Sequence, residues 1–183
     1  SHYGQEYWLS MELAGRFASA NHEVIHHRVS AAVGLKPAAV IENHHNFAWR
    51  ERHRLPDGSD AEVIVHRKGA TPAGPGVLGV IPGSMADPGY VVRGKGVAAA
   101  LNSAAHGAGR AMGRQQALRS LTKPQRDDYL RERGVTLLGG GLDEAPQAYK
   151  RIEAVMAAQS ELVEVVGQFA PLVVRMAEEA GDW

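Results

Sequence analysis

A histidine set among very small residues is the feature of this sequence best suited to chemistry. In the segment NSAAHGAGRAMGRQQA, His106 is followed directly by Gly107, Ala108 and Gly109. Small neighbours let a phosphorus atom approach the imidazole closely, and a neutral imidazole nitrogen can act as a nucleophile in covalent catalysis. If the three following residues begin a helix, their backbone N–H groups would favour an anion. The alternative is a buried histidine packed among small residues, and the segment by itself fits both.

Two arginines follow this histidine at a spacing of four residues. Arg110 and Arg114 would share one face of the helix that we expect over residues 103–121, because residues four apart are neighbours on a helix. Guanidinium groups at this place would neutralise the charge that develops during phosphoryl transfer.

The chain has nine histidines, and two of them are adjacent in the segment ENHHNFAWRE. In an extended backbone His44 and His45 point to opposite sides, so only one of them can readily face a given site. Neutral imidazole is a common ligand of manganese, iron, nickel and zinc. One of the pair is therefore a candidate metal ligand, although a histidine without further donors is more often structural.

Two further segments carry groups that suit a phosphate. In VHRKGATPAG, His66, Arg67 and Lys68 stand at the end of an expected strand, where a guanidinium fork and an ammonium could hold phosphate oxygens. In IPGSMAD, Gly83 and Ser84 form a turn whose amides and hydroxyl could hold a phosphate or the edge of a ring. The alternatives are an ordinary exposed strand end and an ordinary turn.

Helices at both ends and strands in the middle would position these groups. Apolar residues recur at helical spacing near the N-terminus until the sequence GLKP, and alternating β-branched residues predict strands further on. Asp143 is a candidate cap for a last long helix, whose apolar stripe runs from Tyr149 to Val166. The expected segments are a helix over 5–33, strands over 61–68, 77–81 and 90–94, a loop over 69–76, a helix over 103–121, a short helix over 122–134 and a loop over 137–147.

Composition limits the class of protein. The 183 residues, 44% of them hydrophobic, predict a single domain over residues 1–183 in the α+β class, with a mixed sheet flanked by long helices. Twenty basic and twenty acidic side chains cancel, so RNA would need a local basic patch. No apolar run is long enough for a membrane, and the lack of cysteine fits a reducing compartment, so we expect a cytoplasmic protein. The start without Met, directly in an expected helix, suggests a missing upstream segment.

Five segments, in this order, resemble the C-terminal part of the RtcB-type RNA-splicing ligases. They are HHNFA, VHRKGAT, IPGSM, SAAHGAGRAMGR and DEAPQAYK, and the resemblance runs over most of the chain. HGAGR together with HRKGAT is specific, whereas the other segments would be weak alone. The resemblance implies an enzyme that joins RNA 2′,3′-cyclic phosphate or 3′-phosphate ends to a 5′-hydroxyl, with GTP and manganese as cofactors.

The resemblance also implies roles for individual residues. His106 would be the nucleophile that takes GMP from GTP as a phosphoramidate, before the nucleotide passes to the RNA 3′-phosphate. His45 would be a manganese ligand, with Asn46 beside it lining the GTP site. Tyr149 would lie near the guanine. The remaining positions that match the nucleotide site of the family are Pro82, Gly83, Ser84, Met85, Gly107, Ala108 and Gly109.

The sequence departs from the family pattern at three places. The serine that the family has five residues after Ser84 falls on Gly89, which puts one guanine contact in doubt. A family lysine near the C-terminus touches the nucleotide, and here Arg175 is the candidate to replace it. The N-terminal half, which in the family carries Asp and Cys ligands and two further metal histidines, has no counterpart. The chain would then be a truncated product or one half of a divided ligase.

From these observations we predict part of a GTP- and manganese-dependent RNA ligase that acts on RNA ends, such as tRNA halves or broken RNA. The missing N-terminal half would be its partner, in cis or in trans. The first alternative is a non-catalytic fragment that retains the fold and binds guanine nucleotide or RNA ends. The second is a different phosphate-handling enzyme with the same loops.

Overall fold

The computed structural model describes residues 1–176 of the chain. Its contacts divide it into two compact units, Ser1–Lys68 and Gly69–Trp183, which we describe separately. The mixture of helices and small sheets confirms the α+β class. The single domain expected from the length stays a prediction. Within the described residues, no helix has both the length and the apolar character needed to cross a membrane.

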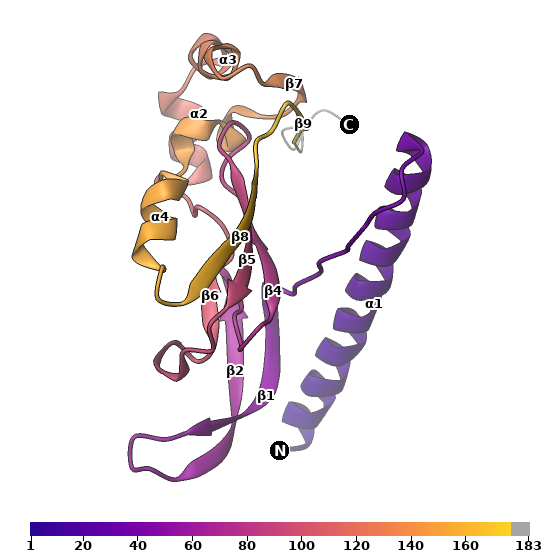
Figure 1. The fold of residues 1–183 in the computed structure, drawn as a ribbon, viewed down its shortest axis with the longest axis vertical. Coiled ribbons are helices and arrows are strands. Elements are labelled where there is room, and N and C mark those ends of the chain that lie inside the picture. Colours follow the sequence, from indigo (N-terminus) through magenta and orange to yellow (C-terminus); the bar gives the residue numbers. More distant parts are fainter. Residues whose placement is uncertain (177–183) are drawn as a thin grey trace. The chain divides into compact units, whose positions relative to one another are not determined.

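The first unit consists of one long helix and a two-stranded hairpin (Figure 1). Helix α1 spans His2–Val33, which confirms the predicted N-terminal helix. The Ser1 side chain caps it by accepting a hydrogen bond from the Gly4 N–H at 3.2 Å. Gly34 ends it in the left-handed conformation, with φ at 66°. Both ends therefore follow from local sequence.

The hairpin of the first unit joins β1 (Asn46–Arg54) to β2 (Asp60–Lys68) in antiparallel register. Its turn is fixed by the Asp57 carboxylate, which accepts a hydrogen bond from the Ser59 N–H at 2.9 Å. Strand β2 covers the predicted strand over 61–68 and adds one residue.

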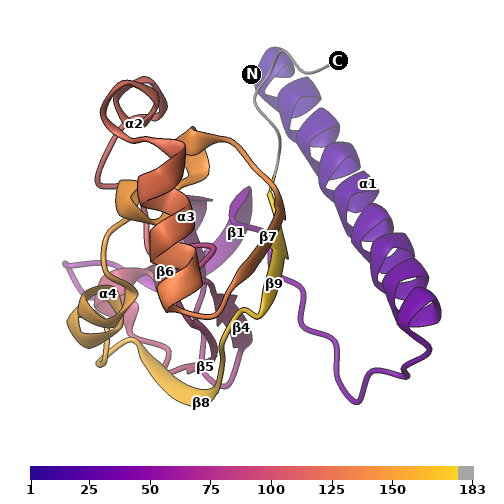
Figure 2. The ribbon, with the colours of Figure 1, turned by 90° about the horizontal axis from the view of Figure 1, so that it is seen from above.

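The second unit is built around a three-stranded antiparallel sheet in the order β4–β5–β8 (Figures 1 and 2). Strands β3 and β6 form an antiparallel pair, and β7 lies beside β9 in parallel. The strands are β3 (Ala70–Pro72), β4 (Leu78–Ile81), β5 (Gly89–Gly94), β6 (Ser103–Ala105), β7 (Thr136–Gly139), β8 (Val163–Phe169) and β9 (Val173–Arg175). The helices are α2 (Arg114–Ser120), α3 (Lys123–Glu132) and α4 (Ile152–Ala158), with 3₁₀ turns η1 (Ala98–Ala100), η2 (Leu142–Glu144) and η3 (Pro146–Ala148).

The helix predicted over 103–121 is wrong in its first half. Residues 103–105 form β6, which pairs with β3, and the α-helix begins only at Arg114. Gly109 has a φ of 71°, which a right-handed helix does not allow. The pairing also makes 70–72 a short strand inside the predicted loop, with Pro72 as its last residue, where the missing N–H is tolerated.

The long helix predicted from Asp143 is also wrong. Asp143 lies in η2, and α4 has only seven residues. The following run rich in valine becomes β8, whose residues pair with β5 from Gly94 back to Gly89. β-branched side chains favour a strand when a sheet edge accepts their backbone hydrogen bonds, and the helical spacing of the same residues does not reveal that edge.

Two buried clusters hold the second unit together and anchor the segments that resemble a nucleotide site. The larger cluster joins all three strands of the sheet to α4 and includes Ala108, with Tyr149 packed against it. The smaller cluster joins Met85 to Leu130 and Val135. The three segments that resemble a nucleotide site are therefore each attached to a core.

Candidate functional site

The second unit contains a cavity of about 610 Å³. Segments from distant parts of the sequence line it: the 82–85 turn, the 106–110 loop, Glu144, Tyr149 and the stretch after β8. Ten second-unit positions were predicted to touch the nucleotide or act as nucleophile, and all of them except Arg175 are in its wall. These nine are Pro82, Gly83, Ser84, Met85, His106, Gly107, Ala108, Gly109 and Tyr149.

His106 follows the last residue of β6, so the β3–β6 pair fixes its backbone. Its N–H donates to the Gly69 carbonyl oxygen at 3.4 Å. Gly69 adopts a φ of 72°, and a methyl group there would lie 3.8 Å from the imidazole Nδ1. The imidazole is half-buried in the cavity wall. This places the ring where a ligand can reach it while its backbone is held.

The loop after His106 is held against the 82–85 turn and does not begin a helix. The Ala108 N–H donates to the Pro82 carbonyl oxygen at 3.0 Å, so this N–H is directed at protein rather than at a ligand. A methyl group on Gly107 would lie 3.2 Å from the same oxygen. The expectation of a helix N-terminus at Gly107–Gly109 is therefore wrong, because α2 starts at Arg114. What the small residues provide is close approach of the two loops.

The 82–85 turn is closed by hydrogen bonds of its own. The Gly83 N–H donates to the Pro88 carbonyl oxygen at 3.1 Å, and the Ser84 hydroxyl donates to Asp87 Oδ2 at 2.5 Å. A methyl group on Gly83 would lie 2.6 Å from the Pro88 oxygen, so a side chain has no room there. Met85 is buried beneath the turn. The turn predicted from the sequence IPGSMAD is confirmed, and its residues 82–85 are part of the cavity wall.

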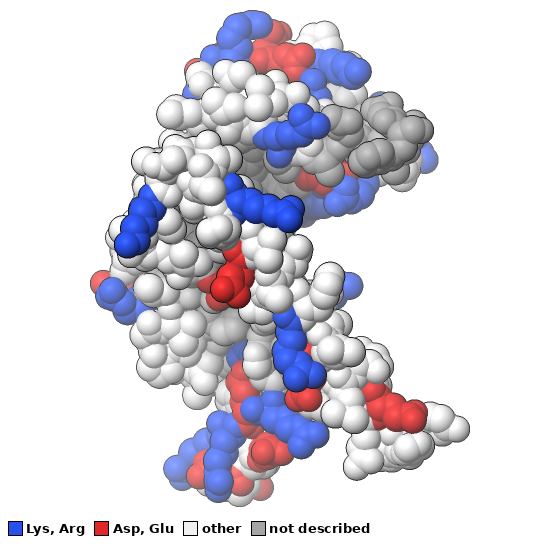
Figure 3. Space-filling model, turned by 90° about the vertical axis from the view of Figure 1, so that its right-hand side faces the viewer, with Lys and Arg blue, Asp and Glu red and all other residues white. Residues whose placement is uncertain are grey.

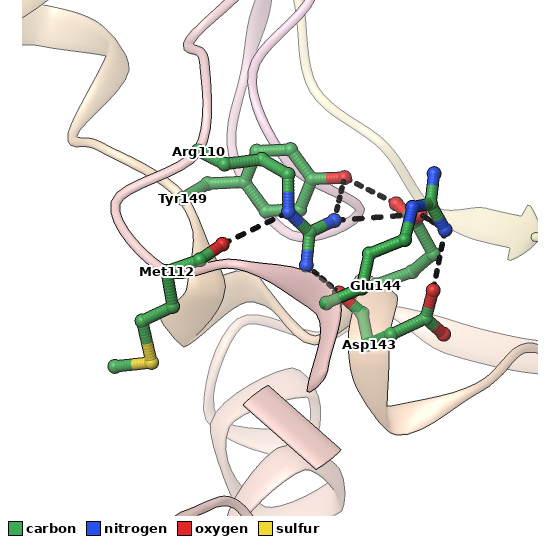
Figure 4. Close-up of polar contacts among 6 residues, drawn as sticks. Arg110, Met112, Asp143, Glu144 and Tyr149 are labelled. Carbon is green, nitrogen blue, oxygen red and sulfur yellow. Dashed lines mark hydrogen bonds and ion pairs between the residues drawn. The ribbon is translucent and has the colours of Figure 1, made fainter. Parts of the chain in front are cut away.

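Two arginines, two acids and a tyrosine form a polar network (Figure 4), and four of them, Arg110, Arg114, Glu144 and Tyr149, line the cavity. Tyr149 donates its hydroxyl proton to Glu144, whose carboxylate also pairs with Arg114 at 2.8 Å and with Arg110 at 3.5 Å. Arg110 lies over the Tyr149 ring, 5.1 Å from its centroid, and donates to the Asp143 carbonyl oxygen. Sequence spacing did place both arginines near one another, but a shared helix face is not the reason, since Arg110 precedes α2.

Glu144 is the central residue of this network, and sequence reasoning missed it. It is buried, and its carboxylate is in contact with both guanidinium groups and the phenol. Burial and the hydrogen bond to Glu144 raise the pKa of Tyr149 to about 12. The phenol is therefore neutral at physiological pH. The segment DEAPQAYK contains both residues five apart, which is the signal that could have found the pair.

Two positions where the sequence departs from the family pattern are now located. Gly89 lines the cavity, and a methyl group there would collide with the Phe169 ring, which also lines it. Phe169 therefore occupies the space that a side chain at position 89 would take. Arg175 is an exposed residue of β9 and is not among the residues of the cavity wall, although Val174 and Met176 on either side are.

His45 and Asn46 belong to the first unit. Asn46 is the first residue of β1, and both side chains are exposed. The neighbouring His44 is partly buried and stacks on Phe47, with ring centroids 5.2 Å apart. Across residues 1–176 the structure contains no group of three or more His, Asp or Glu side chains that could hold a metal. His45 as a manganese ligand stays a prediction.

The basic pair predicted to hold phosphate is divided between the two faces of β2. Arg67 is 3% exposed, forms two hydrogen bonds with Glu51 at 2.5 and 3.0 Å, and lies over the Trp49 ring. Although burial raises the pKa of Glu51, hydrogen bonds with Arg67 and His53 outweigh it and leave this pKa lowered. Arg67 is thus part of the interior, and the phosphate role expected for it is wrong. Lys68, the other member of the pair, is exposed, as is the preceding His66.

Charged side chains of both signs lie on one face of the protein. On the face drawn in Figure 3, Lys and Arg side chains are interspersed with Asp and Glu. Attraction of a polyanion to this face would therefore depend on individual residues rather than on a uniform field.

Comparison with known proteins gives a consistent result. The family model described as tRNA-splicing ligase RtcB matches residues 1–177. The chain is 35% identical to the RNA-splicing ligase RtcB of Escherichia coli (strain K12) in an alignment of 178 positions that covers 90% of this chain and 42% of that protein. It is 33% identical to a tRNA-splicing ligase RtcB of Methanococcus maripaludis, over 85% of this chain and 38% of that protein. For Thermococcus kodakarensis the identity is 32%, over 95% of this chain and 42% of that protein. The chain spans about two fifths of the length of these relatives.

Proposed function

Because the chain belongs to the RtcB family of tRNA-splicing ligases, we propose that it supplies the nucleotide-accepting part of an RNA ligase. The complete enzyme would join RNA 3′-phosphate or 2′,3′-cyclic phosphate ends to 5′-hydroxyl ends at the expense of GTP, with manganese. The names of the relatives support the RNA ligase class. Since this chain has two fifths of their length, the whole reaction belongs to a longer assembly.

One observation carries the proposal: the predicted nucleotide-site segments of the second unit line one cavity. Its volume of about 610 Å³ lies within the range of roughly 300–1,000 Å³ that ligand pockets occupy. The wall offers an imidazole, two guanidinium groups and the side chain of Tyr149. These groups suit the phosphates and the base of a nucleotide.

In the proposed first step, an imidazole nitrogen of His106 attacks the α-phosphorus of GTP. A nitrogen–phosphorus bond forms, the bond to the bridging oxygen breaks, and pyrophosphate leaves with the electron pair. The bound GMP then passes to the RNA 3′-phosphate. Arg110 and Arg114 would neutralise the charge that develops, while Glu144 holds both of them and the phenol of Tyr149 in place.

The described residues do not by themselves form a manganese site. His45 is one exposed donor, and a divalent cation held by one imidazole keeps most of its water ligands. In the complete enzyme manganese would lower the barrier by neutralising phosphate charge. The remaining donors would come from the part of the ligase that has no counterpart here.

A second candidate function is binding of guanine nucleotide or RNA ends in the same cavity without catalysis. A ligation assay distinguishes the catalytic function from the binding function. The unmatched part of the Escherichia coli relative is joined ahead of Ser1, and the fusion is given RNA with a 2′,3′-cyclic phosphate end and RNA with a 5′-hydroxyl end. We expect ligated product that depends on GTP and manganese and disappears with His106→Ala but not with His27→Ala, an exposed histidine of α1. Tight GTP binding without product would leave the binding function instead.

A further inference from the structure

Helix α1 packs against the rest of its own unit along one side only. Trp8 has the guanidinium of Arg50 over its ring at 4.9 Å, Gly15 is buried against Phe47, and His22 lies 3.4 Å from a Glu42 oxygen. Trp8, Gly15 and His22 are each seven residues apart, so they lie on one face of the helix. This face accounts for the contacts of α1 with β1 and with the segment before it.

A row of apolar side chains occupies the opposite face of α1. Measured around the helix axis at 100° per residue, the side chains of this row lie between about 120° and 180° from the centre of the packed face. Leu9 is 64% exposed, Leu13 62%, Phe17 75% and Val24 46%, and Ala20 is exposed as well. We call Leu9, Leu13, Phe17, Ala20 and Val24 the apolar row. Exposed apolar residues spread singly are ordinary, but a continuous row over four turns of one helix marks an interaction surface.

We propose that the apolar row is the docking surface for the part of the ligase that has no counterpart in this chain. The family match begins at residue 1 and so includes all of α1. The helix is therefore an element of the family and not an unrelated extension. More than half of each relative described above lies outside the matched region. A segment of that size can supply an apolar surface to cover the row, and long helices gain most of their stability from such packing.

A second copy of this chain is a poorer occupant. Phe17 is the one aromatic residue in the row, and an aromatic side chain buries about 150–250 Å². Five side chains of these sizes fall well short of the ~800 Å² per partner of a standard stable interface. A segment joined covalently to the chain needs less area, because its effective concentration is high. The inference rests on the family membership and on the exposed row, and it does not depend on the proposed guanylyl transfer.

The experiment compares the isolated 183-residue chain with the fusion that carries the unmatched part of the Escherichia coli relative ahead of Ser1. Leu13→Glu and Phe17→Glu are introduced together into both proteins, with Arg16→Glu as a control at an exposed position outside the row. We expect the double variant to leave the Tm of the isolated chain within about 1 °C of the parent. In the fusion it should lower the Tm by at least about 5 °C, because two charges would then be buried in an apolar contact. The control should change neither protein by more than about 1 °C.

Three outcomes overturn the proposal. An unchanged Tm in the fusion would mean that nothing covers the row. An equal loss in the isolated chain would mean that its own residues cover it. A wild-type isolated chain that sediments as a dimer, and that the double variant converts to a monomer, would identify a second copy as the occupant. If the charged fusion does not fold, hydrogen exchange of residues 9–24 in the unsubstituted fusion decides, since docking must slow it relative to the isolated chain.

Discussion

Replacement of Glu144 tests how the polar network supports the cavity. Glu144 is buried, and its carboxylate accepts the Tyr149 hydroxyl proton and pairs with Arg110 and Arg114. Glu144→Ala removes the carboxylate, so that the guanidinium groups of Arg110 and Arg114 and the phenol of Tyr149 lose their shared partner. Glu144→Gln keeps the shape and one neutral acceptor, so the two variants separate charge from packing.

The expected loss of stability follows from how deeply Glu144 and its two arginine partners are buried. Breaking a fully buried ion pair costs about 3–5 kcal/mol, because it leaves an uncompensated charge. The Arg114 side chain is 65% exposed and water screens it, whereas Arg110 is 24% exposed. We therefore expect Glu144→Ala to lower the free energy of unfolding by about 2–3 kcal/mol, and Glu144→Gln by about half of that. For a chain of this length the first loss corresponds to a Tm lower by roughly 5–10 °C.

Titration of Tyr149 gives a second readout of the same change. Burial and the Glu144 hydrogen bond raise its pKa to about 12, against about 10 for an unperturbed tyrosine. The folded state therefore holds a proton that the unfolded state has lost, so this contribution to stability is complete below pH 10 and disappears as the pH rises to 12. Glu144→Gln should lower the Tyr149 pKa toward 10, measured by tyrosinate absorbance with Tyr149→Phe to assign the transition. An unchanged Tm in Glu144→Ala together with an unchanged titration would refute the role of Glu144.

Three further predictions concern single positions. Gly89→Ser should lower the Tm because its side chain collides with Phe169, and the added change Phe169→Ala should recover most of the loss caused by the collision. If both single and double variants melt like the parent, the position tolerates a side chain. Arg67→Ala should destabilise the first unit by about 2–4 kcal/mol, because its carboxylate partner stays behind, whereas Lys68→Ala should leave chemical denaturation unchanged. Equal effects would contradict the buried pair. His45→Ala in the fusion should weaken manganese binding in calorimetry without a change in Tm, since the side chain is exposed; unaltered affinity removes it from the site.

Local sequence was sufficient wherever a segment carries its own signals. The start and end of α1 follow from the Ser1 cap and from Gly34, and the 82–85 turn follows from a glycine where a side chain has no room. The motif segments also identified most of the second-unit cavity wall, because resemblance to a family carries over the position of each loop. The ends of α1 and the turn depend on residues close in sequence, whereas the cavity wall brings together distant segments that the family resemblance located.

Long-range contacts decided the rest. Arg67 is buried because its partner Glu51 lies sixteen residues earlier on the neighbouring strand, and spacing within 66–68 contains no trace of that pairing. Residues 163–169 are a strand because β5 offers an edge. The apolar periodicity of α1 predicted the helix correctly, but it marked residues such as Phe17 as apolar without indicating what they pack against.

A labelling experiment determines whether His106 accepts the nucleotide. The fusion is incubated with manganese and GTP labelled at the α-phosphorus, and the labelled peptide is identified after proteolysis. We predict an acid-labile, hydroxylamine-sensitive guanylate on His106, absent in His106→Ala and present in His27→Ala. The isolated chain should take up little or no label, because its described residues lack a metal cluster. Label that persists in His106→Ala, or that maps to another residue, would contradict the assignment of the nucleophile.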